Sequence, residues 1–216
     1  EWIANFARSR HLTGVGPDEN QYYSASPFLE KGFHDVGRFG RLRFVEQSEP
    51  GVPVVRNGRF LETDARGLPL HWSVSADDVG QVSLDERVFR TGGRSLRLEG
   101  REGGTVQLTQ LLPELKPDTA YLLTYFMKTE AIQGEGRQIG AMVNVWTDRN
   151  EWFPSNWQRG DLAWSKMGFV IQPNSGINQK RKSYMRLRIT GSGAVWFDDV
   201  QIRALDTLTP ERSPSP

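Results

Sequence analysis

The sequence of 216 residues contains no cysteine. This absence excludes disulfides, zinc–thiolate sites and cysteine nucleophiles, but it does not exclude export from the cell. The chain also lacks any apolar run near the roughly 18 residues that a membrane-spanning helix needs, so no membrane span is expected. Its formal net charge is only +1, which provides no overall field to attract nucleic acid, and no nucleic-acid partner is expected.

Motifs of the common enzyme chemistries are missing as well. There is no G-x-S-x-G nucleophile elbow, no H-E-x-x-H metal site and no glycine-rich phosphate loop. One of the three histidines, His34, precedes Asp35, and that pairing alone is weak evidence of catalysis. Pairs of carboxylates could cleave glycosides, but such pairs are common in a chain with 26 acidic residues. The pairs considered are Asp77–Asp78, Asp198–Asp199 and Asp148–Glu151. We therefore do not expect this chain to be an enzyme by itself.

Patterns of long helices are also absent, and short β-type runs separated by Gly, Pro, Asn and Asp take their place. The runs span 70–75, 81–84, 94–99, 104–111, 120–128, 138–147, 165–171, 183–190 and 194–203. Short strands at this spacing are typical of antiparallel sandwiches. In the run 183–190, the alternation predicts that Met185, Leu187 and Ile189 face the core. The predicted fold is an all-β antiparallel β-sandwich.

The two ends of the chain differ from this pattern. Residues 1–55 show too little apolar periodicity for an independent domain, so they are expected to be an extension that packs on the sandwich or the tail of a preceding domain. The sandwich is predicted over 56–205. Residues 206–216 are rich in Pro and Ser and are expected to be a disordered tail or linker.

The last predicted strand contains a carboxylate that needs a partner. Residues two apart in a strand share a face, so Asp198 is predicted to face the core together with Val200 and Ile202. A buried carboxylate is costly unless it is paired. Its partner would be an arginine, a ring of backbone N–H groups or a hard cation.

Six short motifs follow one another between residues 55 and 204. They are NGRF at 57–60 with LPLHW at 68–72, GGRSLRL at 92–98, LKPDTAY at 115–121, YFMK at 125–128, Trp164, and VWFDDV at 195–200. In this order and spacing they resemble the CenC-like carbohydrate-binding modules, the grouping of families 4, 9, 16 and 22.

The resemblance implies a jelly roll of the galactose-binding-domain-like type. It implies a non-catalytic module that binds polysaccharide or oligosaccharide beside a catalytic domain of the same polypeptide, in a secreted, periplasmic or cell-surface bacterial protein. Two alternatives stay open. One is a structural, interdomain sandwich of a glycoside hydrolase or lyase without glycan affinity of its own. The other is a protein–protein or cell-surface adhesion module with the same fold.

The resemblance also implies a structural Ca²⁺, since carboxylate and carbonyl oxygens suit this ion. Asp198 and Glu62 would supply side-chain ligands, with Asn57 as a further candidate. The family's glutamate directly follows the phenylalanine of the first motif, where this chain has Leu61. A shift by one residue changes the face of a strand, so Glu62 reaches the ion only if a bulge intervenes.

Six of the seven tryptophans divide into scaffold and ligand candidates. Trp72, Trp164 and Trp196 fall on family motifs beside strands and are assigned to the scaffold. Trp152 and Trp157 lie in a segment without periodicity, which predicts a surface loop. Exposed aromatic rings there would be unfavourable without a ligand, a partner surface or residues 1–55 to cover them.

Trp146 ends a run in which alternation separates two faces. Ala141, Val143 and Val145 form the better core face, so Asn144 and Trp146 are predicted on the outer face. Aromatic rings stack on the C–H face of sugars, while amides and carboxylates bond hydroxyl groups. The candidate ligand-binding residues are therefore Trp146, Trp152, Trp157, Asn144, Asp148, Glu151, Asn156 and Gln158.

Overall fold

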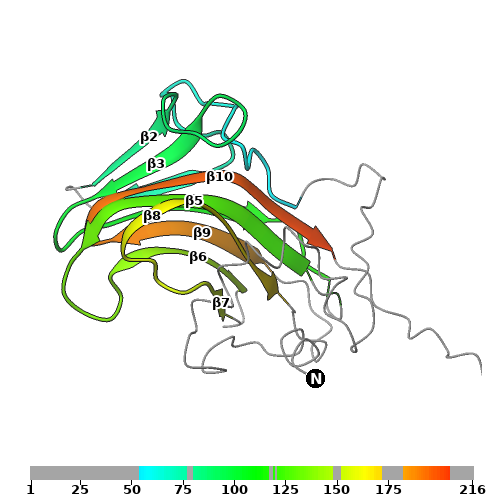
Figure 1. The fold of residues 1–216 in the computed structure, drawn as a ribbon. Coiled ribbons are helices and arrows are strands. Elements are labelled where there is room, and N and C mark those ends of the chain that lie inside the picture. Colours follow the sequence, from blue (N-terminus) through cyan, green and yellow to red (C-terminus); the bar gives the residue numbers. More distant parts are fainter. Residues whose placement is uncertain are drawn as a thin grey trace, which may run out of the picture.

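The computed structural model describes residues 54–76, 80–116, 119, 121–147, 152–171 and 182–204. These residues form ten strands and contain no helix, and hence none long and apolar enough to cross a membrane (Figure 1). The strands are β1 (Ser73–Ala76), β2 (Gln81–Asp85), β3 (Ser95–Gly100), β4 (Thr105–Leu112), β5 (Tyr121–Gln133), β6 (Gly140–Thr147), β7 (Trp152–Pro154), β8 (Gly160–Ile171), β9 (Ser183–Thr190) and β10 (Ser192–Ala204). The predicted all-β fold is confirmed.

The strands form two antiparallel sheets. The first sheet has the order β1-β4-β9-β6-β7, and the second sheet has the order β2-β3-β10-β5-β8. Consecutive strands such as β3 and β4, or β9 and β10, belong to opposite sheets, so the chain passes repeatedly between the layers. Figure 1 shows the second sheet, with β10, β5 and β8, lying over β9 and β6 of the first. This is the antiparallel sandwich of the jelly-roll type.

The core lies between the two sheets and follows the predicted alternation. Met185, Leu187 and Ile189 of β9 are fully buried, as are Ala141, Val143 and Val145 of β6. All six belong to one continuous hydrophobic cluster. Because these side chains point inward, the intervening residues of β6 and β9 lie on the outer face of the first sheet.

The start of the described chain is pinned to this core. Val55 is buried in it, and the ring of Phe60 packs against Trp72 at 5.7 Å. The scaffold role predicted for Trp72 is thus confirmed. Residues 1–53 and 205–216 lie outside the described residues, so the expectations for the N-terminal extension and the C-terminal tail stay predictions.

One predicted loop is wrong in part. Residues Trp152–Pro154 form β7, which pairs with β6 at the edge of the first sheet. Phe153 is buried in the core and anchors this short strand. A strand of three residues shows no measurable periodicity, and its proline suits an edge position because it cannot donate a ladder hydrogen bond.

A β-bulge corrects the prediction for Asp198. The pairing of β10 with β5 shifts between Asp198 and Gln201, and Asp199 adopts a left-handed φ of 48°. The bulge reverses the alternation, so Phe197 before it and Val200 after it both face the core. Asp198 lies directly opposite Phe126, and with it on the outer side of the second sheet.

Candidate functional site

The outer face of the first sheet carries a cluster of aromatic and basic side chains. Cross-strand pairing places Trp146 opposite Tyr184, and Asn144 opposite Arg186. On the other side of β6, Trp146 pairs with Trp152 of β7. Directly opposite residues of antiparallel strands share a face, so these five side chains form one surface, which we call the aromatic face.

Three rings form the centre of the aromatic face. Trp146 stacks on Tyr184 with ring centroids 5.2 Å apart and an interplanar angle of 18°. Trp152 lies on the other side of Trp146, with centroids 6.3 Å apart. Trp152 is 40% exposed, so part of this aromatic surface is open to solvent.

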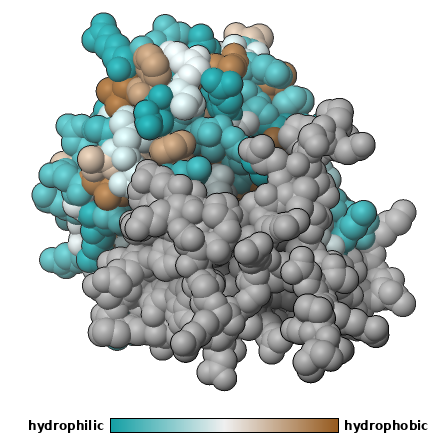
Figure 2. All heavy atoms as spheres, turned by 45° about the vertical axis from the view of Figure 1, so that its right-hand side comes forward, coloured by the Kyte–Doolittle hydropathy of each residue, from teal (hydrophilic) through white to brown (hydrophobic). Residues whose placement is uncertain are grey.

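The open apolar surface extends along the same face. Large hydrophobic residues that are exposed within the described part of the chain are Leu61, Leu70, Phe89, Leu111 and Trp152. Leu111 of β4 pairs with Tyr184 and therefore lies beside the stacked rings. Figure 2 shows another side of the molecule, where the described surface is mostly hydrophilic and its hydrophobic residues are scattered. The aromatic face thus joins exposed apolar side chains to a ring cluster.

Two arginines of β9 lie against these rings. The guanidinium carbon of Arg186 is 4.4 Å from the ring centroid of Trp146 and 5.9 Å from that of Trp152. The guanidinium of Arg188 lies 5.4 Å from the ring of Trp157, and its Nε donates to Thr190 Oγ1 at 3.0 Å. Cations over ring faces are attracted by the ring quadrupole. The face is therefore both aromatic and positively charged.

Asn144 lies at the base of this arrangement. It is fully buried, between Arg186 on β9 and Pro154 on β7. Neither its amide nitrogen nor its amide oxygen has a hydrogen-bond partner in the part of the chain that the structure describes. Such orphaned amides are rare inside proteins and call for an explanation.

The remaining sequence-predicted residues lie near this face or outside the described ranges. Trp157 joins the face through Arg188. Asn156 and Gln158 are half-buried in the segment after β7, where the backbone of Gln158 pairs with that of Ala141. The side-chain amide of Gln158 donates to its neighbour's carbonyl oxygen at 3.0 Å. Asp148 and Glu151 lie outside the described residues.

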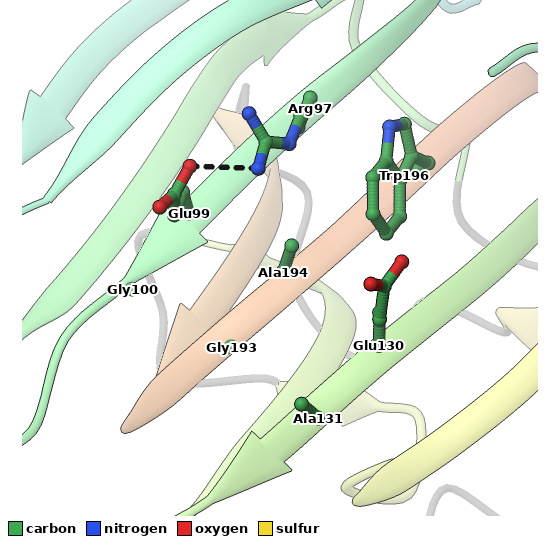
Figure 3. A pocket seen from close by; sticks show the side chains of 8 residues that line it. All are labelled: Arg97, Glu99, Gly100, Glu130, Ala131, Gly193, Ala194 and Trp196. Carbon is green, nitrogen blue, oxygen red and sulfur yellow. Dashed lines mark ion pairs between the residues drawn. The ribbon is translucent and has the colours of Figure 1, made fainter.

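The second sheet has a different outer surface, with a cavity of about 260 Å³ (Figure 3). The carboxylates of Glu99 on β3 and Glu130 on β5 lie on either side of β10. Each is already paired along its own strand, Glu99 with Arg97 at 2.8 Å and Glu130 with Lys128 at 3.3 Å.

Trp196 lines the same cavity, but its ring is already occupied. The guanidinium carbon of Arg97 and the ammonium of Lys128 lie 5.5 and 4.2 Å from its centroid. Its Nε1 donates to Asp85 at 2.8 Å, and the residue is 4% exposed. The scaffold role predicted for Trp196 is confirmed, and this cavity offers no free ring for a ligand.

The carboxylate of Asp198 has a partner in the backbone. One oxygen accepts the amide N–H groups of Arg90 and Thr91 at 2.9 and 2.7 Å. The other accepts the N–H of Asp199 at 2.7 Å and the Thr91 hydroxyl at 3.3 Å. The ring of N–H groups, one of the three partners considered from the sequence, is the one present.

These contacts do not fit a calcium ion. The side-chain amide of Asn57 forms hydrogen bonds within its own loop. Its nitrogen donates to the carbonyl oxygens of Glu62 and Leu70, and its oxygen accepts the N–H of Glu62. The carboxylate of Glu62 is exposed and lies 3.9 Å from His71 Nε2. No group of three His, Cys, Asp or Glu side chains that could hold a metal ion occurs among the described residues. Calcium stays a prediction of the resemblance, without support from these side chains.

Comparison with known proteins finds proteins of similar fold but no matching family. No family model and no curated protein matches the chain. The enzymatically active domain of tailspike protein 4 from bacteriophage CBA120 matches at TM-score 0.55 and 13% identity, over 71% of this chain and 21% of that one. A cyclase from Fischerella sp. TAU, solved with 4-(1H-indol-3-yl)butan-2-one, matches at TM-score 0.54 and 16% identity, over 74% of this chain and 100% of its own.

Carbohydrate-binding modules are also among the similar structures. A family 61 module, solved with β-1,4-galactotriose, has a TM-score of 0.47 and 14% identity over 71% of this chain and 99% of its own. The two matches with TM-scores above 0.5 show a shared fold, and the aromatic face has to be judged by its own geometry.

The predicted site residues did not include Tyr184, Arg186 and Arg188, although a pattern in the sequence points to them. The alternation that places Met185 and Leu187 inward also places these three residues outward. Their meeting with Trp146 and Trp152 depends on the pairing of β9 with β6, which no local pattern specifies. A pairing between distant segments is what brought the site together.

Proposed function

We propose that this chain is a non-catalytic, CenC-like carbohydrate-binding module that binds polysaccharide on the outer face of its first sheet. The stack of Trp146 on Tyr184, extended by the partly exposed Trp152, is the observation that carries the proposal. Aromatic faces pack against the apolar C–H side of pyranose rings and bring contact area at little entropic cost. Neighbouring amides and guanidinium groups would bond the sugar's hydroxyl groups.

Three of the described carboxylates, those of Asp198, Glu99 and Glu130, are already engaged by other groups of the protein. Glycoside cleavage needs two carboxyl groups free to act on one bond. The carboxylate of Asp198 accepts hydrogen bonds from backbone N–H groups, while Glu99 and Glu130 are each paired with a cation. Among the described residues, none of these three combines an unpaired carboxylate with the aromatic face.

The wider context is part of the same proposal. A module of this kind serves a catalytic domain of the same polypeptide by holding it on its substrate, which places it in a secreted, periplasmic or cell-surface protein. A structural calcium belongs to the proposal only through the resemblance.

Affinity electrophoresis through gels that contain single polysaccharides tests the proposal. The wild-type chain should be retarded by at least one polysaccharide of a neutral and acidic panel. Trp146→Ala and Trp152→Ala should each weaken binding by about tenfold or more, since they remove the stacking surface. Phe126→Ala is the matched control, because Phe126 lies with two cations, Arg90 and Lys166, on the outer face of the other sheet.

Two results would overturn the proposal. One is free migration in every gel, which would favour a structural sandwich whose aromatic face packs against another domain. The other is retardation that both tryptophan variants retain and Phe126→Ala loses, which would move binding to the second sheet.

A further inference from the structure

Two cations of the second sheet, Arg97 and Lys128, show one way in which charge on an outer face of this protein is neutralised. Arg97 and Lys128 both lie over Trp196, and each also forms an ion pair with a glutamate two residues along its own strand. The aromatic ring and the carboxylate act together there. The ring stabilises the charge, and the carboxylate accepts the N–H groups.

Arg186 has the rings without the carboxylate. Its guanidinium lies over Trp146 and near Trp152, yet it forms no ion pair and no hydrogen bond with any described residue. Its Nε is buried without an acceptor among the described residues, as is the Nε of Arg97, so the difference between the two arginines is the carboxylate that pairs with Arg97. Ring faces attract a cation but do not accept the in-plane N–H groups of a guanidinium, so these donors are left unused.

The surroundings increase the cost of the Arg186 charge. Burial and the positive charge of the nearby Arg188 both lower the pKa of Arg186 from its ordinary value, although arginine stays charged at neutral pH. The outward positions of β4 and β9 around it carry Thr, Gln, Leu, Tyr and Arg, with no acidic side chain. Two cations thus lie two residues apart on a strand that supplies no negative charge.

Asn144 gives a second, independent observation. It is the cross-strand neighbour of Arg186, and its buried amide also lacks a partner among the described residues. A cation and an amide side by side, both with unused donors and backed by stacked rings, match a group with several acceptor oxygens. A carboxylate or a sulfate ester on a sugar has those oxygens.

We propose that the aromatic face selects anionic glycans, with the guanidinium of Arg186 pairing with a carboxylate or sulfate of the sugar while the exposed part of Trp152 stacks on its ring. This inference rests on the proposed glycan binding and adds the charge of the ligand to it. Arginine suits the role because its planar fork matches two oxygens of one anion.

The test compares acidic polysaccharides with their neutralised forms, using the full chain and isothermal titration calorimetry. The carboxylate arm uses polygalacturonate, alginate and hyaluronate, each with its carboxyl-reduced counterpart. The sulfate arm uses chondroitin sulfate with its desulfated counterpart. The wild-type chain should bind at least one acidic polymer about 10- to 100-fold more tightly than its neutral partner, and sodium chloride should weaken the acidic complex.

The variants assign that preference to one side chain. Arg186→Gln should remove the preference for the acidic form, whereas Arg186→Lys should keep part of it because the charge remains. Arg97→Gln on the second sheet is the matched control and should leave both affinities unchanged. The salt titration of the wild-type chain needs no variant, so it decides even if Arg186→Gln does not fold.

The outcomes separate the two proposals. Equal binding of acidic and neutral forms overturns the anionic preference and leaves the glycan-binding function standing. An acidic preference that survives in Arg186→Gln also overturns the inference. Binding of no polymer in either form overturns both proposals together.

Discussion

Asn144 lies on the same face of β6 as Trp146, and its contribution to the stability of the fold can be tested separately. The side-chain amide of Asn144 has no hydrogen-bond partner in the described structure. A buried amide without a partner destabilises the fold, so removing this amide should change the free energy of unfolding only slightly. We expect Asn144→Ala to keep the wild-type melting temperature within a few degrees and to leave the affinity for polysaccharide nearly unchanged, because the buried amide has no surface to offer a ligand. Thermal melts and calorimetry on the same samples check this. A large drop in stability with unchanged affinity would mean that the amide serves the fold.

Asp85 is a residue whose protonation should be visible in stability. Burial raises the pKa of its carboxyl, but hydrogen bonds outweigh burial and hold that pKa below its ordinary value. The donors are Trp196 Nε1 and the amides of Val88 and Arg87. A depressed folded-state pKa contributes stability that is complete above the unfolded-state pKa, about 4, and is lost as the pH falls through the folded-state value.

This sign gives a prediction for acid unfolding. The melting temperature should stay level from neutral pH to about 5 and fall below about 4, and Asp85→Asn should flatten part of that fall. Scanning calorimetry of both proteins across this range measures the difference. Parallel curves for the two proteins would show that the Trp196–Asp85 contact makes no such contribution.

At the scale of elements, the sequence supplied the strands better than their irregularities. Alternation located nine of the ten strands and the inward faces of β6 and β9. It failed at the bulge in β10 and at the edge strand β7, because a bulge resets the period of two and three residues are too few to show one. The aromatic face needed a further step, since its partners come from strands joined by long-range pairing.

The bulge makes Asp198 a clamp between β10 and the loop before β3. Its carboxylate holds the backbone of Arg90 and Thr91, so Asp198→Ala would leave buried N–H groups unsatisfied. We expect a loss of about 3 kcal/mol in the free energy of unfolding, measured by urea titration. Hydrogen bonds alone predict no response of the wild-type chain to Ca²⁺ or a chelator. A calcium-dependent rise in melting temperature that Asp198→Ala abolishes would place the ion at this carboxylate after all.

For the whole molecule, the sandwich gives its two outer surfaces different tasks. On the second sheet, Arg97 and Lys128 lie over Trp196, and each is paired with a glutamate. On the first sheet the same packing of rings and cations is left without a carboxylate at Arg186. The core between the sheets holds β6 and β9 in register, which fixes the aromatic face before any ligand arrives.

Oxidative footprinting of the aromatic side chains, with and without the polysaccharide panel, tests the central claim most directly. The account predicts that a bound polysaccharide protects Trp146, Trp152 and Tyr184 from oxidation while the reactivity of Phe126 and Trp196 stays unchanged. Unchanged oxidation of the three rings with every polysaccharide, or protection centred on Trp196, would contradict it.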